Sequence, residues 1–273
     1  MEGEGAPTGI QRRIRWRERV FGMVAPVLPT PSVAPSGAPI LLYHHLAEAG
    51  TRPCDSFAVP VDCFERQMRW LVERYQVVTV AELVARLDGD GGRKLVAVTF
   101  DDGYQSVVTR ALPILRALAI PATLFLGTGN LNRPPPALRD DDVRRLRDGG
   151  FEIGSHTVTH PDLRRLDDAA LGRELVASRA HLEDLTGAAV TGFAYPYGFH
   201  DPRVVRAVRD AGYRYACTTR QHRFNLPTSD RYRLTRQEIN PLDGTTRFER
   251  KLAGRYAPLY GVWDRLLYGP EEA

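Results

Sequence analysis

The chain has 273 residues, of which 43% are hydrophobic and 26% charged, and this composition suits one large α/β domain with a substantial core. Its formal charge is +4, but all 37 basic residues except Lys94 and Lys251 are arginines scattered along the chain, which argues against a nucleic-acid-binding surface. Three widely spaced cysteines without a CxxC pair argue against a disulfide framework or a cysteine zinc site. No apolar run approaches the roughly 18 residues of a membrane-spanning helix.

Residues 1–37 are rich in Gly, Pro and Arg and lack hydrophobic periodicity, so we expect a flexible leader. The basic residues in 12–19 precede a short apolar stretch, 20–28, which Pro26 and Pro29 interrupt. This pattern only partly matches a cleaved signal peptide, whose apolar region spans about 7–15 residues. A tail that touches a membrane surface is the alternative, and localisation in the cytoplasm or the cell envelope stays open.

Strands and helices are predicted to alternate through a domain over 38–245. The predicted strands are 39–43, 76–80, 94–100, 122–126, 151–155, 192–195, 213–218 and 232–236. The predicted helices are 62–75, 81–87, a segment within 108–118, 139–148, 167–187 and one that Asp201-Pro202 opens. This alternation predicts a parallel sheet with helices packed outside it, either a barrel or a doubly wound sheet.

The last segment, 246–273, is predicted to be an amphipathic tail that packs on this domain. Its apolar residues recur at helical spacing: Phe248, Leu252, Tyr256, Tyr260, Trp263, Leu266 and Leu267. Contact with a membrane interface is the alternative, because Arg, Trp and Tyr suit that environment.

A first motif, TFDDGY, occupies 99–104 at the C-terminal end of the strongly apolar strand 94–100. Ligands bind at that end of the strands in parallel α/β folds, so the adjacent carboxylates of Asp101 and Asp102 are candidate functional groups. Two Asp residues before a Gly could also form a turn or cap the next helix.

A second motif, SHTVTH, occupies 155–160 and follows strand 151–155. In a helical turn, its spacing would place the imidazoles of His156 and His160 on one face, where they can chelate one metal ion. A carboxylate from Asp102 would complete a two-His-one-carboxylate set with open positions.

A third motif, FAYPYG, occupies 193–198 at the end of strand 192–195. It predicts an exposed backbone N–H, with aromatic rings forming one wall of a substrate groove. A Pro/Gly turn that only terminates the strand is the alternative.

TFDDGY, SHTVTH and FAYPYG, in this order and spacing, resemble the polysaccharide deacetylases of the NodB-homology superfamily, carbohydrate esterase family four. The flanking segments LLYHHL and ELVASRAHLEDLTG agree, and the resemblance covers roughly 38–240. It implies a distorted (β/α) barrel of about seven parallel strands in the domain over 38–245. It also implies a hydrolase that removes N-acetyl groups from amino-sugar units of a glycan, with an acetylated glycan or oligosaccharide of the cell envelope as its partner.

The resemblance also implies roles for individual residues. Asp102, His156 and His160 would hold one divalent metal, commonly Zn²⁺. Asp101 would be the general base that deprotonates the attacking water, and the metal and the Tyr197 backbone N–H would stabilise the oxyanion. The residues expected to contact the substrate are Tyr104, Tyr195, Pro196 and Tyr197.

Two positions depart from the family pattern. The third motif often begins with an Arg that orients the base, but this chain has Ala194 there, and Arg236 is our candidate for that task. The late Leu-x-His motif, whose His protonates the leaving amine, reads Leu-Thr-Arg at 234–236. We therefore predict His44 as the general acid, with His45 as the second choice.

Three other functions stay open at this stage. An O-acetyl esterase acting on sugars would use the same parts. A two-His-one-carboxylate set also occurs in iron oxygenases, although an adjacent base has no evident role there. A catalytically impaired glycan-binding relic is the third. The glycan itself depends on loops such as 129–136 and 221–230, whose shapes the sequence does not give.

Overall fold

The computed structural model describes residues 36–51, 55–90, 94–134 and 137–268. The predicted leader over 1–37 therefore lies almost entirely outside the described residues, and so do the expectations of an export signal or a membrane contact there. No helix within the described ranges is long and apolar enough to cross a membrane.

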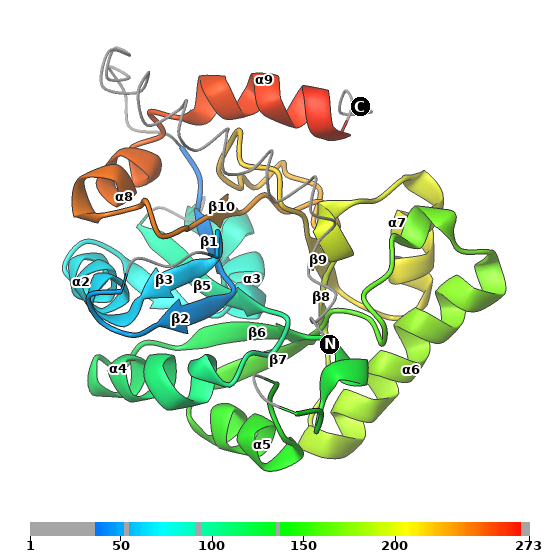
Figure 1. Cartoon of the computed structure of the whole chain (residues 1–273). Helices are drawn as coiled ribbons and strands as arrows, with labels where there is room; N and C mark the ends of the chain where they lie inside the picture. Colours follow the sequence, from blue (N-terminus) through cyan, green and yellow to red (C-terminus); the bar gives the residue numbers. More distant parts are fainter. Residues whose placement is uncertain (1–35, 52–54, 91–93, 135–136, 269–273) are drawn as a thin grey trace.

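A curled sheet of parallel strands occupies the centre of the molecule (Figure 1). Its strands follow the order β10-β1-β5-β6-β7-β8-β9, and β4 pairs with the first half of β5. The prediction of a distorted (β/α) barrel of about seven parallel strands is thus confirmed. The strands of this sheet are β1 (Ile40–Tyr43), β4 (Gln76–Val78), β5 (Leu95–Asp101), β6 (Ala122–Leu126), β7 (Phe151–Ser155), β8 (Gly192–Ala194), β9 (Tyr215–Cys217) and β10 (Gln237–Glu238).

The strands form where short apolar runs are buried on both faces. All seven residues of β5 and all five of β6 are buried, as expected for parallel strands covered on both sides. A separate parallel pair, β2 (His45–Ala47) and β3 (Ala58–Pro60), lies beside the main sheet and was not predicted.

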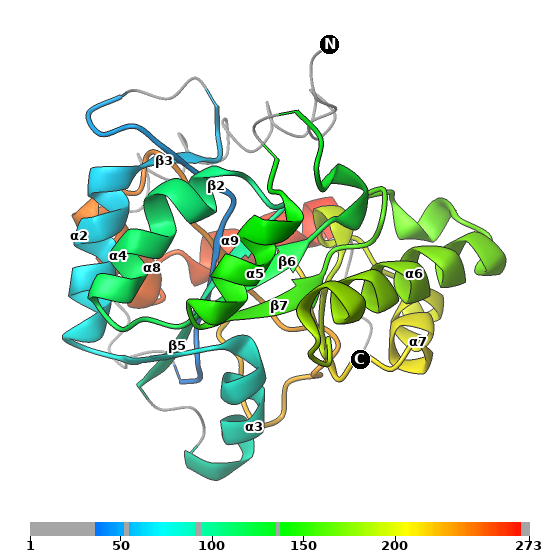
Figure 2. The ribbon, with the colours of Figure 1, turned by 90° about the horizontal axis from the view of Figure 1, so that it is seen from below.

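Helices cover the outside of the curled sheet (Figures 1 and 2). Each buries one apolar face; in α2, for example, Phe64, Met68 and Leu71 are fully buried. The longest begins where the Asp167 side chain caps the Ala170 N–H and ends at Gly187, as its sequence predicts. The flanking helices are α2 (Val61–Val72), α3 (Val80–Asp90), α4 (Leu112–Ala117), α5 (Asp140–Asp148), α6 (Asp168–Thr186) and α7 (Pro202–Asp210).

One short stretch of chain closes the sheet. Leu234 pairs with Cys217 at the end of β9, and three residues further on Gln237 and Glu238 pair with β1. The strand predicted over 232–236 is instead found at Gln237–Glu238. Leu234 forms only an isolated bridge to Cys217 at the β9 edge, and the residues that follow pair with the β1 edge. Arg236 lies between the two pairings, so the closure of the sheet also determines where this side chain enters the interior.

The C-terminal segment forms two helices, α8 (Thr245–Leu252) and α9 (Ala257–Tyr268), instead of one continuous tail. Phe248 on α8 is fully buried, and its ring packs edge-on against Trp70 of α2. Tyr256 and Tyr260 are also buried, whereas Leu266 is 77% exposed although its spacing predicts contact with the domain. Figure 1 shows α8 and α9 in orange and red on the side of the sheet opposite α4 and α5.

Candidate metal and acid–base site

The three sequence motifs meet at the carboxyl edge of neighbouring strands. β5 ends at Asp101, β7 at Ser155 and β8 at Ala194, and each motif continues into the loop that follows. Asp102 has a positive φ of 72°, so the chain turns sharply as it leaves β5. The two adjacent carboxylates consequently meet different neighbours.

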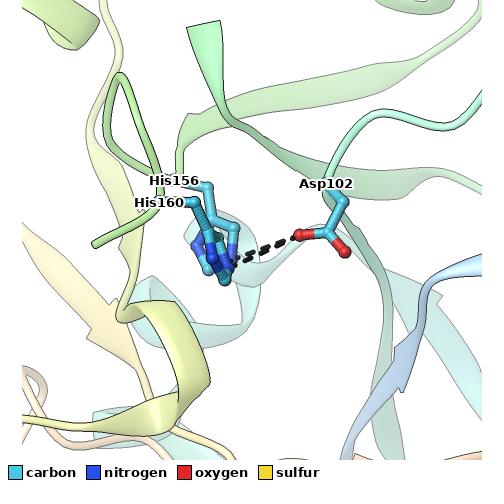
Figure 3. A group of neighbouring side chains, drawn as sticks. All are labelled: Asp102, His156 and His160. Atoms are coloured by element: carbon cyan, nitrogen blue, oxygen red, sulfur yellow. Dashed lines mark hydrogen bonds and ion pairs between the residues drawn. The ribbon is translucent and has the colours of Figure 1, made fainter. Parts of the chain in front are cut away.

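Asp102 lies opposite the two histidines of the second motif. Its Oδ1 is 3.6 Å from Nε2 of His156 and 3.7 Å from Nε2 of His160, and the two Nε2 atoms are 3.1 Å apart. Figure 3 shows both imidazoles directed at this carboxylate. These three residues form a group whose ligand atoms are close enough to bind one ion.

The size of this triangle fits a first-row divalent metal. A point equidistant from the three atoms lies about 2.0 Å from each, which is the usual Zn–N and Zn–O distance. The donor set of two imidazoles and one carboxylate leaves further positions for water or substrate. The residues therefore fit the metal that the motifs predict.

The histidines reach this arrangement from a loop, and the expectation of a helical turn is wrong. Thr157 and His160 have positive φ values of 71° and 59°, which a helix does not contain. Glu174 of α6 accepts hydrogen bonds from the N–H groups of Val158 and Thr159 at 2.7 and 2.9 Å. A distant carboxylate thus supports the loop where helical hydrogen bonds would otherwise do so.

His156 is held in one tautomer by the strand next to it. Its Nδ1 lies 2.7 Å from the Ala194 carbonyl, which can only accept a hydrogen bond, so Nδ1 carries the hydrogen and the Nε2 lone pair faces the other ligands. Burial lowers the pKa of His156 to about 3, although the charge of Asp101 opposes this shift. The imidazole is therefore neutral, as a metal ligand must be.

Asp101 forms a bidentate ion pair with Arg236. Nη1 and Nη2 of the guanidinium each donate to one carboxylate oxygen at 2.7 Å, and Nε donates to the Thr218 carbonyl at 2.9 Å. Both side chains are buried. Burial alone would raise the pKa of Asp101, but the charge and hydrogen bonds of Arg236 outweigh it and keep the pKa below its usual range.

The neighbouring carboxyl is affected in the opposite direction. Burial raises the pKa of Asp102, the charge of His44 opposes this shift, and the charge of the neighbouring Asp101 adds to it. Two adjacent carboxyl groups whose pKa values are displaced in opposite directions are typical of groups with different chemical tasks.

His44 and His45 have different surroundings. The His44 ring packs on Phe57 with centroids 4.4 Å apart, and its buried Nδ1 has no hydrogen-bond partner among the described residues. Burial lowers the pKa of His44, while the charges of Asp102 and Asp101 oppose this shift. His45 instead pairs with Asp55 at 2.8 Å and stacks on Tyr104.

Residues of the third motif divide between the site and the core. The Tyr197 ring meets the His160 ring edge-on at 4.5 Å. The preceding residues of the motif belong to the core. Tyr195 is fully buried and its hydroxyl donates to the Tyr232 carbonyl, so its ring does not form the groove wall that the motif predicts. Pro196 is buried as well. Tyr104 stacks on His45, and its contact with the substrate stays a prediction.

Several residues of the site have no signature in the sequence. Glu174 supports the histidine loop from the middle of α6, and Phe57 packs on His44 from the segment before β3. Asp55, which pairs with His45, was not among the predicted site residues. Glu174 and Phe57 act through contacts between distant segments, which leave no local pattern. Asp55 gave a weak local signal, because it is a carboxylate ten residues from a histidine at a strand end.

The same region of the chain is similar to known deacetylases. Residues 88–216 match the family model of the polysaccharide deacetylases. A chitooligosaccharide deacetylase of Bradyrhizobium sp. is 36% identical over 133 residues, which are 47% of this chain and 58% of that protein. YxkH of Bacillus subtilis is 29% identical over 188 residues, which are 68% of this chain and 65% of that protein. The matches thus span about three fifths of the length of these relatives.

The crystal structure of a polysaccharide deacetylase from Bacillus cereus has the same fold. It superimposes with a TM-score of 0.69 and 26% sequence identity, and covers 79% of this chain and 68% of that one. Asp101 and the candidate metal ligands Asp102, His156 and His160 fall inside the segment that the family model matches, whereas His44 and Arg236 fall outside it. The family-model match therefore includes Asp101 and the candidate metal site, but not His44 or Arg236.

Proposed function

We propose that this chain is a member of the polysaccharide deacetylase family and a metal-dependent hydrolase that removes N-acetyl groups from amino-sugar units of a glycan. The observation that carries the proposal is the joint geometry of two units. Asp102, His156 and His160 converge with the spacing of a metal site, and beside them Asp101 is kept ionised by Arg236.

The metal site would be made by Asp102 Oδ1 and the Nε2 atoms of His156 and His160. A divalent ion held there, most simply Zn²⁺, supplies a Lewis acid that acidifies water and polarises the acetyl carbonyl. The Ala194 carbonyl fixes the His156 ring so that its Nε2 lone pair is available to the ion.

Asp101 would act as the general base. Its carboxylate accepts the proton of the attacking water, and the low pKa that Arg236 imposes keeps it ready to accept at neutral pH. A carboxylate whose pKa is lowered is a weaker base, so it depends on a water whose own pKa is lowered at the same site. Arg236 also fixes the direction of both carboxylate oxygens.

Tyr197 and His44 would complete the reaction. The Tyr197 N–H would donate to the oxyanion that develops on the acetyl oxygen. His44 would deliver a proton to the leaving nitrogen, so that acetate and a free amine are released. The packing of the His44 ring on Phe57, and the absence of a hydrogen-bond partner for its buried Nδ1 among the described residues, support this assignment over His45, which Asp55 already engages.

The substrate class follows from the relatives. The Bradyrhizobium protein is named for chitooligosaccharides, which are oligomers of N-acetylglucosamine, and an amide substrate gives the general acid a task because an amine is a poor leaving group. An ester of an acetylated sugar would use the same residues, and assay results on the two kinds of substrate decide between them.

The decisive experiment is acetate release from a panel of N-acetylated and O-acetylated glycans. The zinc-loaded protein is assayed beside Asp101→Asn, which keeps the shape of the side chain but cannot act as a base. Release from N-acetylated oligosaccharides that Asp101→Asn abolishes supports the proposal. Release from O-acetylated sugars alone would establish an esterase, and glycan binding without any release would establish a binding protein.

A further inference from the structure

The loop of the third motif has an unusual backbone. Tyr197 has φ 59° and ψ 3°, and Gly198 follows with φ 73°, so two successive residues adopt the left-handed region. This conformation is unfavourable for a bulky aromatic residue and persists only where neighbouring contacts determine it. The N–H of Tyr197, in the peptide group that precedes this residue, is also the donor to which the proposed function assigns the oxyanion.

A chain of two hydrogen bonds reaches this loop from the C-terminal helix. The Thr219 hydroxyl donates to the Tyr197 carbonyl at 3.2 Å, and the Tyr268 hydroxyl lies 2.5 Å from the same Thr219 oxygen. Because the single hydroxyl hydrogen of Thr219 is directed to Tyr197, Tyr268 is the donor to Thr219. Tyr268 on α9 is thereby connected to Tyr197 through one side chain.

The loop and Thr219 are packed without spare room. A Cβ added to Gly198 would lie 2.1 Å from the Thr219 hydroxyl oxygen and 2.7 Å from its backbone nitrogen. Only glycine therefore permits this approach, and a shift of Thr219 would move the Tyr197–Gly198 peptide with it.

The end of α9 is itself fixed to the segment that carries Thr219. Asp264 is 2% exposed, and one of its carboxylate oxygens accepts from the Gln221 N–H at 2.8 Å, the His222 N–H at 3.2 Å and the His222 ring at 2.9 Å. The Arg220 guanidinium lies 5.0 Å from the centre of the Tyr268 ring. The Tyr268 hydroxyl is thus aimed at Thr219 by contacts on both sides.

From these contacts we infer that Tyr268 is a positioning residue for the Tyr197 loop: through Thr219, α9 holds the Tyr197 carbonyl and with it the left-handed backbone of Tyr197, which sets the direction of the N–H that the reaction requires. The inference rests on the proposed function for its catalytic consequence, although the structural connection does not depend on it. Since the Tyr197 N–H would act on charge that develops only in the transition state, a loosened loop lowers kcat and leaves KM nearly unchanged.

The test is Tyr268→Phe, which removes the hydroxyl and keeps the ring on Arg220 and Phe199. We expect kcat for the N-acetylated substrate to fall about 3- to 10-fold, the range that loss of one ordinary hydrogen bond produces. Tyr75→Phe is the matched control, because its ring packs on Trp70, away from the site. Thr219→Val should lower kcat similarly, Thr219→Ser should retain it, and the double variant Tyr268→Phe/Thr219→Val should be no worse than Thr219→Val.

Hydrogen exchange separates this inference from the proposed function. In the metal-loaded protein, the amides of residues 197–199 should exchange faster in Tyr268→Phe than in Tyr75→Phe. If the wild-type chain releases no acetate but this exchange difference is found, the proposed function fails and the positioning stands. Unchanged exchange, a wild-type kcat in Tyr268→Phe, or additive effects in the double variant would each overturn the positioning.

Discussion

Arg236 and Asp101 lie 135 positions apart in the sequence, and the guanidinium of one holds both carboxylate oxygens of the other at 2.7 Å inside the protein. Arg236 is fully buried, and the Asp101 side chain is only 3% exposed. A buried pair of this kind gains little net stability over an apolar pair, but either partner alone is costly. We therefore infer that the role of Arg236 is to keep the Asp101 carboxylate ionised and oriented.

The first prediction concerns this pair. Arg236→Met leaves a buried carboxylate without its counter-charge, so we expect the free energy of unfolding to fall by about 3–5 kcal/mol. The double variant Arg236→Met/Asp101→Asn should recover most of that loss, while acetate release is absent. Urea denaturation and an acetate assay measure both effects. A double variant as unstable as the sum of its single variants would show that the pair is not the source of the loss.

The second prediction concerns metal binding. Replacing Asp102, His156 or His160 by Ala removes one of three ligand atoms, and each variant should retain well under one metal ion per chain after dialysis and show no acetate release. His181→Ala, an exposed histidine on α6, is the control. Elemental analysis gives the metal content, and wild-type stoichiometry in any of the three variants would remove that residue from the site.

The third prediction distinguishes the two adjacent histidines. His44→Gln should lower turnover of an N-acetylated substrate by about 10²- to 10⁴-fold, the usual contribution of a general acid. An aryl acetate, whose leaving group needs no proton, should be hydrolysed at close to the wild-type rate. His45→Gln should affect both substrates only slightly, since His45 pairs with Asp55. Equal losses on amide and ester would contradict the role of His44 as proton donor.

The fourth prediction concerns stability and pH in the metal-free protein. His156 has a folded-state pKa of about 3 against an ordinary value of 6.5, so between these values the unfolded chain binds more protons. Stability should therefore fall as the pH is lowered through this window, by up to about 1.4 kcal/mol per pH unit for this residue. His44, His160 and His200 contribute with the same sign.

Urea denaturation of the chelated protein at a series of pH values measures this slope. His156→Gln should reduce it, because glutamine takes up no proton on unfolding, whereas the exposed His181→Gln should leave it unchanged. A slope that is identical in His156→Gln and in the wild type would mean that this imidazole is not held neutral by burial.

Local sequence patterns predicted most strands of the main sheet and the strand-end positions of the candidate site, but not the β2–β3 pair or the exact position of β10. The apolar runs that become β5, β6 and β7 are bounded by turn residues, and polar motifs follow two of them. The choice of Arg236 came from the resemblance, because a family position for an arginine was occupied by Ala194. In the structure the Ala194 carbonyl fixes His156 instead, a task that any residue type can perform.

Contacts between distant segments could not be predicted. The spacing of His156 and His160 suggested a helix because two residues four apart are neighbours there, but positive φ values and Glu174 produce the same proximity in a loop. The division of the C-terminal tail into α8 and α9 depends equally on remote partners, such as the backbone of Gln221 for Asp264. A single sequence contains no periodic pattern that would predict the loop of His156 and His160 or the break between α8 and α9.

The stretch between Leu234 and Glu238 both closes the sheet and carries Arg236, the partner of Asp101, and it is synthesised late. A chain emerging from the ribosome can complete β5 and display Asp101 long before residue 236 is synthesised. Until then that carboxylate lacks the guanidinium that donates to both of its oxygens in the folded protein, and the sheet is not closed between β9 and β1. Because Arg236 lies between the two pairings that close the sheet, its ion pair with Asp101 requires the closed sheet. A chain that ended before Arg236 would carry the group of Asp102, His156 and His160 without the counter-charge of Asp101.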